Sequence, residues 1–382
     1  MPSGLPAQID LSADQLHNWK LLEVFRQRLA PRLQRRNKTR TELDPRRTLE
    51  IEQYLSLLML ALLNPVLKTA RSVCAASQFA RVQTETGGPA ISLPSFSAMQ
   101  HVVEPELLAG LLRELSTEAL PIYGDDRLRQ KVGDLIANDG TLLPALPRMA
   151  WALWQNPGNR AGKLHLEFSV WRQVPVEFEI TDGNRSERAV WKSKLRKGAF
   201  YVNDRNYSHD YELIKEVQAT GASFVLRLHN NAVITPVGEA RPLTEADQAA
   251  GVVSDQRVRL GEDANGPVGR LVQVEADGHT FLLFTDRADL EAELVALIYR
   301  YRWQIELFFK WIKCILGCRH WMAESQEGLT VQVYCALIAS VLLVLWTGRK
   351  PTKRQWEALQ LYWMGFVTIE ELERVLGVRK IA

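Results

Sequence analysis

The sequence predicts an α/β domain with a β-rich insertion, placed between a helical N-terminal region and a helical C-terminal tail. Three observations lead to this prediction. Short apolar runs with the alternation of strands recur between residues 134 and 230, separated by helical segments. A Gly-, Pro- and Asp-rich segment at 230–286 interrupts them. Apolar residues with helical spacing occur on both sides, so we expect helices at 1–125, the α/β domain at 126–347 and the tail at 348–382.

The N-terminal region is expected to consist of helices. The run TLEIEQYLSLLMLALLNP is a strongly apolar helix that ends at Asn64-Pro65. The run LPSFSAMQHVVEPELLAGLLRELS contains two short helices, with Pro105 in the first turn of the second. Short helices with a tight joint suit a helix-turn-helix DNA-binding element and, equally, an ordinary helical bundle.

The overall charge does not identify a partner. A formal net charge of +3 is too small to indicate a polyanion. The stretch 26–47 is rich in arginine and lysine, which is typical of a solvated helix or arm and also of a surface that grips phosphates. Four cysteines in 382 residues give no disulfide framework and suit a reducing cytosol.

Neither a leader nor a membrane span is expected. The N-terminal sequence MPSGLPAQIDLSADQ lacks the basic start and the apolar run of a signal peptide. The segment VYCALIASVLLVLW at 333–346 is the one membrane candidate, and it is shorter than the roughly 20 residues that a span needs. We therefore expect a buried core helix at this position and a soluble, cytoplasmic protein.

The α/β domain is predicted from the order of its elements. Strands are expected at 134–139, 164–171, 174–183, 199–204 and 223–230, and helices at 184–195 and 208–221. The second and third strands form an antiparallel pair, and a helix separates them from the fourth. Three strands, a helix, then alternating strand and helix is the order of an RNase H-like α/β domain.

One helix near the end of this domain predicts a site. The stretch IYRYRWQIELFFKWIKCILG at 298–317 places Tyr299, Arg302, Glu306 and Lys313 within an arc of roughly 60°, at about 100° per residue. These four chemically different groups border an apolar stripe of roughly 120°. A plain amphipathic helix scatters its charges over the far face, so this alignment indicates a functional surface.

Two aspartates complete the predicted site. Asp139 and Asp204 are each expected at the carboxyl end of a strand, with a turn following, and Glu306 comes from a helix that can pack beside that edge. Three converging carboxylates stay ionised only with cations between them. Hard oxygen ligands select Mg²⁺ or Mn²⁺ rather than zinc. Two such ions, roughly 4 Å apart, activate an attacking oxygen and stabilise the leaving oxygen of a phosphodiester.

Groups on the same helix suit a nucleic-acid substrate. Arg302 and Lys313 are expected to hold phosphates, and Tyr299 offers a hydroxyl to a phosphate or a ring to a base. Trp303 and Trp311 suit either base stacking or core packing.

This pattern resembles the IS4-like family of bacterial DDE transposases, whose hallmark is Tyr, two residues, Arg, three residues, Glu, six residues, Lys. Residues 299–313 fit this spacing without a gap, and the blocks DGT at 139 and YVNDRNY at 201–207 resemble the family's sequence around its first two acids. The strand pair GKLHLEFSVWRQVPVEFEITDGN resembles the segment between them. The resemblance covers roughly residues 130–345.

The resemblance implies an RNase H-like catalytic domain with a β-rich insertion before the third acid. It implies that Asp139, Asp204 and Glu306 are catalytic and bind two Mg²⁺ ions. Its substrates would be double-stranded DNA, namely terminal inverted repeats and target DNA. A homodimer would hold them in a synaptic complex. The protein would be bacterial and associated with the nucleoid.

Two positions depart from the family pattern. Asn206 stands where a small, glycine-like residue is expected. No tryptophan occurs between Asp204 and Trp303, although some relatives hold a flipped base against a tryptophan of the insertion. Phe281 or another apolar residue could take that role.

The expected activity is cleavage at the ends of an element, followed by attack of the freed 3′-hydroxyl on target DNA. Two alternatives remain, a relative that binds DNA without cutting it and a metal-dependent endonuclease that never joins strands. A two-carboxylate glycosidase is disfavoured, because the arginine and lysine beside Glu306 suit phosphate better than sugar.

Overall fold

The computed structural model describes residues 20–39, 42–45, 47–317, 321–350 and 352–377. The N-terminal part is helical, as predicted. Its elements are α2 (Lys20–Arg35), α3 (Ile51–Leu63), α4 (Ala70–Ala76), α5 (Ala80–Thr86), α6 (Leu93–Ala98), η1 (Met99–His101), α7 (Pro105–Glu118) and α8 (Asp126–Val132).

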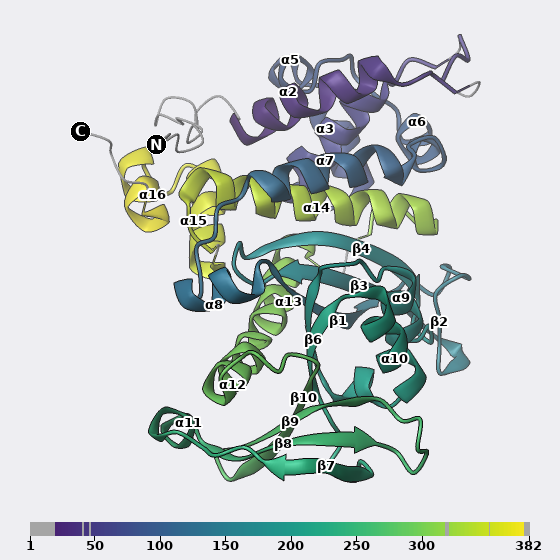
Figure 1. The fold of residues 1–382 in the computed structure, drawn as a ribbon. Helices are drawn as coiled ribbons and strands as arrows, with labels where there is room; N and C mark the ends of the chain where they lie inside the picture. The colour runs from purple at the N-terminus through teal and green to yellow at the C-terminus, as the bar shows by residue number, and fades with distance from the viewer. Residues whose placement is uncertain (1–19, 40–41, 46, 318–320, 351, 378–382) are drawn as a thin grey trace.

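The arginines of α2 are largely engaged within the protein. Arg28 binds Glu118 at 2.8 Å and Arg32 binds Glu114 at 2.6 Å, so the basic face of α2 rests on acids of α7. Arg26 reaches Glu52 on α3 at 2.9 Å. These contacts join the first helices into one packed layer, which Figure 1 shows above the sheet.

A ten-stranded sheet forms the centre of the molecule, in the order β2-β3-β1-β5-β6-β10-β9-β8-β7 with β4 paired to β3. Strands β1 and β5 are parallel, as are β5 and β6, whereas β1, β3 and β4 are antiparallel neighbours. The strands are β1 (Leu135–Pro144), β2 (Leu153–Trp154), β3 (Asn156–Ser169), β4 (Val174–Asp182), β5 (Phe200–Asn203), β6 (Ser223–Arg227), β7 (Ile234–Ala240), β8 (Val252–Leu260), β9 (Val268–Ala276) and β10 (His279–Thr285).

Strand β1 differs from the prediction. It was expected to end at Asp139, but it continues to Pro144, because β3 pairs with it from Ser169 to Ala161. Asp139 itself lies opposite Leu166. The sequence Asp-Gly-Thr is typical of a turn, and here the long antiparallel partner overrides that local preference.

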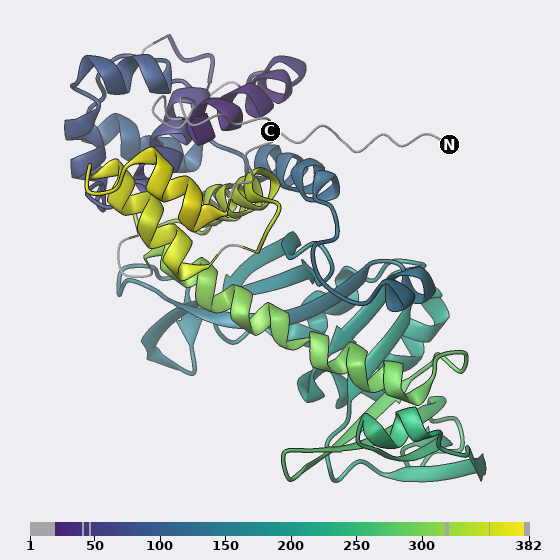
Figure 2. The same ribbon diagram turned by 90° about the vertical axis from the view of Figure 1, so that its left-hand side faces the viewer.

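Each face of the sheet is covered by its own helices. On one face lie α12 (Ala292–Tyr301) and α13 (Trp303–Leu316), whose apolar residues share a core with Leu135 and Ala137. Figure 2 shows these helices crossing the near side of the sheet. On the other face, α9 (Glu187–Ser193) and α10 (Tyr211–Thr220) share a core with Ile136. Successive side chains of β1 therefore point alternately to the two faces of the sheet.

Helix α14 (Gln326–Thr347) lies between the sheet and the N-terminal helices (Figure 1). The core helix expected at 333–346 is confirmed, but it is longer than predicted. At 22 residues it is long and apolar enough to cross a membrane, and 89% of its 18-residue apolar window is buried inside the protein. Helices α15 (Lys353–Trp363) and α16 (Ile369–Leu376) follow it, as the predicted helical tail required.

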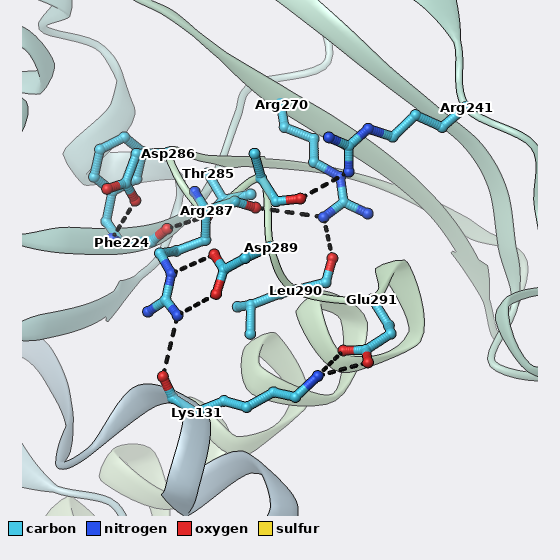
Figure 3. Close-up of polar contacts among 11 residues, drawn as sticks. Lys131, Phe224, Arg241, Arg270, Thr285, Asp286, Arg287, Asp289, Leu290 and Glu291 are labelled. Atoms are coloured by element: carbon cyan, nitrogen blue, oxygen red, sulfur yellow. Dashed lines mark hydrogen bonds and ion pairs between the residues drawn. The ribbon is translucent and has the colours of Figure 1, made fainter.

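The insertion extends the central sheet. It contains β7 to β10 and the short α11 (Glu245–Ala249), and its last strand, β10, pairs with β6. The turn after β10 is fixed by polar contacts (Figure 3): Asp286 accepts from the backbone of Phe224, and Arg270 donates to the carbonyl of Leu290. Lys131 binds Glu291 at 2.5 Å. These contacts set the position from which α12 begins.

Candidate active site

Asp139 and Asp204 occupy matching positions on neighbouring parallel strands. The parallel register of β1 and β5 ends at the pair Ala137–Val202, and each aspartate lies two residues further on. Ala137 and Val202 belong to the core under α12 and α13, so the alternation directs both aspartates to that face. Asp204 follows β5 directly, as predicted, and begins the 3-10 helix η2 (Arg205–Ser208).

The two carboxylates interact electrostatically. Burial, followed by the charge of Asp204, raises the pKa of Asp139 to about 7. Burial also raises the pKa of Asp204. The guanidinium of Arg302 opposes both shifts, and the backbone N–H of Gly140 lowers the pKa of Asp139 by donating to it at 2.8 Å. Closely placed buried acids of this kind are typical of functional sites.

The site helix comprises α12 and α13, which meet at Arg302. The sequence predicted one continuous helix, but at this junction the backbone N–H of Arg302 donates to Tyr299 and that of Ile305 donates to Arg302. This tighter i to i+3 bonding divides the helix locally. The Arg302 guanidinium lies 5.6 Å from the Tyr299 ring centre and donates to Glu306 at 2.6 Å.

Lys313 ties the far end of the site helix to β1. Its Nζ donates to Oγ1 of Thr141 at 2.7 Å, two residues beyond Asp139. The predicted arc of four groups therefore lies along the face that turns toward the aspartates. Tyr299, at the other end, packs against Phe281 of β10 with ring centres 6.0 Å apart.

The side chains around Asp139 and Asp204 determine whether a divalent cation fits this site. Among the residues that the structure describes, no three His, Cys, Asp or Glu side chains lie close enough together to hold a metal ion as they stand. Asp139 and Asp204 fit a cation, because buried like charges gain from a positive charge between them. Glu306 accepts a hydrogen bond from Arg302 at 2.6 Å.

Glu187 is the site residue that sequence reasoning missed. It is the first residue of α9, its side chain is 13% exposed, and it accepts from Asn206 Nδ2 at 2.7 Å. Its charge raises the pKa of Asp139 and of Asp204. No spacing in the sequence links it to either aspartate, because α9 approaches the sheet from the opposite face.

Two further acids in this domain have structural roles. Asp134 accepts from Ser169 at 2.7 Å, and Asp210 caps α10 by accepting from the backbone of Leu213 at 3.1 Å. Trp311 is buried, but Trp303 is 48% exposed and therefore is not a core residue. His165 is buried and hydrogen-bonded to Thr181.

The fold is mixed α/β, and two buried aspartates lie on the face of its sheet that is covered by the helix carrying Arg302 and Glu306. A sequence model of the "Transposase DDE domain" family matches residues 130–342, more than half of the 382-residue chain. The chain therefore belongs to the transposase DDE domain family, as its motifs predicted.

Similar proteins carry the same designation. "Putative transposase y4zB" of Sinorhizobium fredii is 30% identical over 210 residues, 54% of this chain and 58% of that protein. "Transposase for insertion sequence element IS421" of Escherichia coli is 40% identical over 230 residues, 49% of this chain and 61% of that protein. The chain thus spans little more than half the length of these curated relatives. The cryo-EM structure of the piggyBac transposase synaptic complex with hairpin DNA aligns at a TM-score of 0.44 and 11% identity, over 96% of this chain and 80% of that chain, a similarity too low to bear on function.

Proposed function

We propose that the chain is a DNA transposase that cuts at the ends of an insertion element and joins the freed 3′-hydroxyl to target DNA. Family membership supports DNA as the substrate. The observation that carries the proposal is the matched placement of Asp139 and Asp204 beyond the last parallel pair of β1 and β5, facing a helix that presents Glu306.

The three acids would form the catalytic centre of an RNase H-like domain. Asp139, Asp204 and Glu306 would hold two Mg²⁺ or Mn²⁺ ions, which when bound supply Lewis acidity and a charged clamp for in-line phosphoryl transfer. Arg302 holds Glu306 at 2.6 Å, and its positive charge partly offsets the rise that burial causes in the pKa of Asp139 and of Asp204. It would release Glu306 toward the aspartates as substrate enters.

The cationic groups on the site helix would bind the DNA backbone. Lys313 would contact a phosphate from its place beside Thr141, and Arg302 would contact a second one. Tyr299 would support a phosphate or a base, with the ring of Phe281 behind it.

The rest of the chain would recognise DNA and assemble the complex. We assign residues 1–125 to DNA recognition, 126–347 to catalysis, with the insertion at 230–286, and 348–382 to a basic tail. Because Arg28 and Arg32 of α2 are paired with acids of α7, only part of the positive charge of α2 is available to phosphates. Two ends cut and joined together require two active sites, so we expect a homodimer in the synaptic complex, acting on DNA in the bacterial cytoplasm.

The test uses a linear duplex that carries the inverted repeats flanking the gene. Wild-type protein and Glu306→Gln are incubated with it in Mg²⁺ or in EDTA. The proposal predicts a Mg²⁺-dependent nick at the repeat's end and joined products, both lost in Glu306→Gln while DNA binding persists. Nicks without joined products would indicate an endonuclease. Binding without any cut would indicate a DNA-binding relative.

A further inference from the structure

Glu187 contacts both residues that fix the two aspartates. Gly140 donates its backbone N–H to Asp139 at 2.8 Å, and Asn206 donates its backbone N–H to Asp204 at 2.9 Å. Each aspartate is thus oriented by a peptide group shortly after it. The same two residues, Gly140 and Asn206, are the ones that meet the Glu187 carboxylate.

The contact with Gly140 depends on the missing side chain. A Cβ at this position would lie 2.5 Å from Oε1 of Glu187, far inside contact distance. Glycine therefore lets the carboxylate reach β1 from the opposite face of the sheet. On that face Lys163 of β3 lies 3.3 Å from Glu187 and partly balances its charge.

The contact with Asn206 is a hydrogen bond. Its side-chain Nδ2 donates to Oε2 of Glu187 at 2.7 Å, while its backbone N–H serves Asp204. A glycine at this position would have no side-chain donor for Glu187. The asparagine that departs from the expected sequence pattern is therefore the residue that connects Asp204 to Glu187.

We propose that Glu187 is a positioning residue that holds strand β1 at Asp139 and the turn at Asp204 at one spacing, and so sets how tightly the pair binds a divalent cation. This inference rests on the proposed function, because the ion matters only if the aspartates bind it. Residues that support metal ligands typically change metal affinity or activity about 10- to 100-fold when replaced.

Five proteins test this role: wild type, Glu187→Ala, Glu187→Gln, Asn206→Ala and the double variant Glu187→Ala/Asn206→Ala. Mn²⁺ binding is measured by calorimetry without DNA, and Mg²⁺-dependent cleavage is measured separately. We expect Glu187→Ala and Asn206→Ala each to weaken Mn²⁺ binding about 10-fold or more, and the double variant to be no weaker than Glu187→Ala. Glutamine at 187 still accepts from Asn206, so Glu187→Gln should recover most of the affinity.

The matched control is Glu216→Ala, which removes a carboxylate of α10 that binds Lys192 of α9 at 2.6 Å. It should bind Mn²⁺ like wild type. A lower unfolding temperature with unchanged Mn²⁺ affinity in Glu187→Ala and Asn206→Ala would overturn the inference, as would a wild-type protein that binds no Mn²⁺. If Glu187→Ala does not fold, Asn206→Ala tests the same link without altering α9. Wild type that binds Mn²⁺ but does not cut contradicts the proposed function alone.

Discussion

Nη2 of Arg302 donates a 2.6 Å hydrogen bond to Oε1 of Glu306, one helical turn further along the site helix. The Arg302 side chain is 12% exposed and that of Glu306 is 29% exposed, so the pair is partly shielded from water. Burial raises the pKa of Asp139 and of Asp204, and the same guanidinium partly offsets both rises. One cation therefore serves three carboxylates, which makes Arg302 the internal counter-charge of the site.

Replacing this counter-charge should impair catalysis. In Arg302→Ala, Glu306 loses its anchor and the two aspartates lose a nearby positive charge, so we expect cleavage to fall about 10- to 100-fold. Arg302→Lys keeps the charge but not the planar guanidinium, so its cleavage rate should lie between those of Arg302→Ala and wild type. Single-turnover cleavage rates at saturating Mg²⁺ measure this, and equal rates in all three proteins would contradict it.

Asp139 should make the metal-free protein less stable as the pH rises. Its pKa of about 7 in the folded state lies above the unfolded value of 3.8, so the folded state binds more protons between these values. Stability is therefore lost as the pH rises from about 4 to 7 and is constant above that. The loss is up to about 4 kcal/mol, at about 1.4 kcal/mol per pKa unit.

The measurement compares wild type with Asp139→Asn in EDTA. We expect the unfolding free energy of the asparagine variant, relative to wild type, to increase between pH 4 and pH 8. A difference that does not change with pH would show that burial does not perturb this carboxyl.

Trp303 and Trp311 should behave differently although they lie on one helix. Trp303 is 48% exposed with the Lys310 ammonium 5.4 Å from its ring centre, whereas Trp311 is 5% exposed and donates to Ser340. We expect Trp303→Ala to weaken DNA binding by about 1–3 kcal/mol, the size of a base-stacking contact, without changing stability. Trp311→Ala should instead cost about 3–5 kcal/mol of folding stability.

Fluorescence anisotropy with end DNA and chemical denaturation separate these two effects. If Trp303→Ala binds DNA as tightly as wild type, the Trp303 side chain belongs neither to the core nor to the DNA-binding surface.

The buried pair Arg270–Asp255 should hold β9 to β8 within the insertion. Arg270 Nε lies 2.7 Å from Asp255 Oδ1, and both side chains are nearly inaccessible. Arg270→Met leaves Asp255 buried without its partner and should cost about 3–5 kcal/mol. Arg270→Met with Asp255→Leu removes both charges and should recover much of that loss. If the single and double variants unfold alike in urea, the pair does not carry this stability.

Local sequence was sufficient for much of the site. The strand that ends before Asp204, and the helical spacing from Tyr299 to Lys313, depend on short-range patterns, and the structure has both. The predicted end of β1 was wrong, because pairing with a distant strand, β3, extends β1 to Pro144. Glu187 was missed because its contact with Gly140 crosses the sheet, and no periodicity reports such a contact.

Backbone geometry explains the remaining differences. The break at Arg302 arises from i to i+3 hydrogen bonds within a sequence whose side-chain pattern is continuous. The pairing of β10 with β6 depends on the path of the insertion, which composition alone does not determine.

The most direct test removes one carboxylate at a time. Asp139→Asn, Asp204→Asn and Glu306→Gln are compared with Asp210→Asn, whose asparagine can still cap α10. In Mg²⁺ with end DNA, the first three should bind the duplex without cutting it, and the control should cut at the wild-type rate. Cleavage at the wild-type rate by any of the first three would contradict a site built from these three acids.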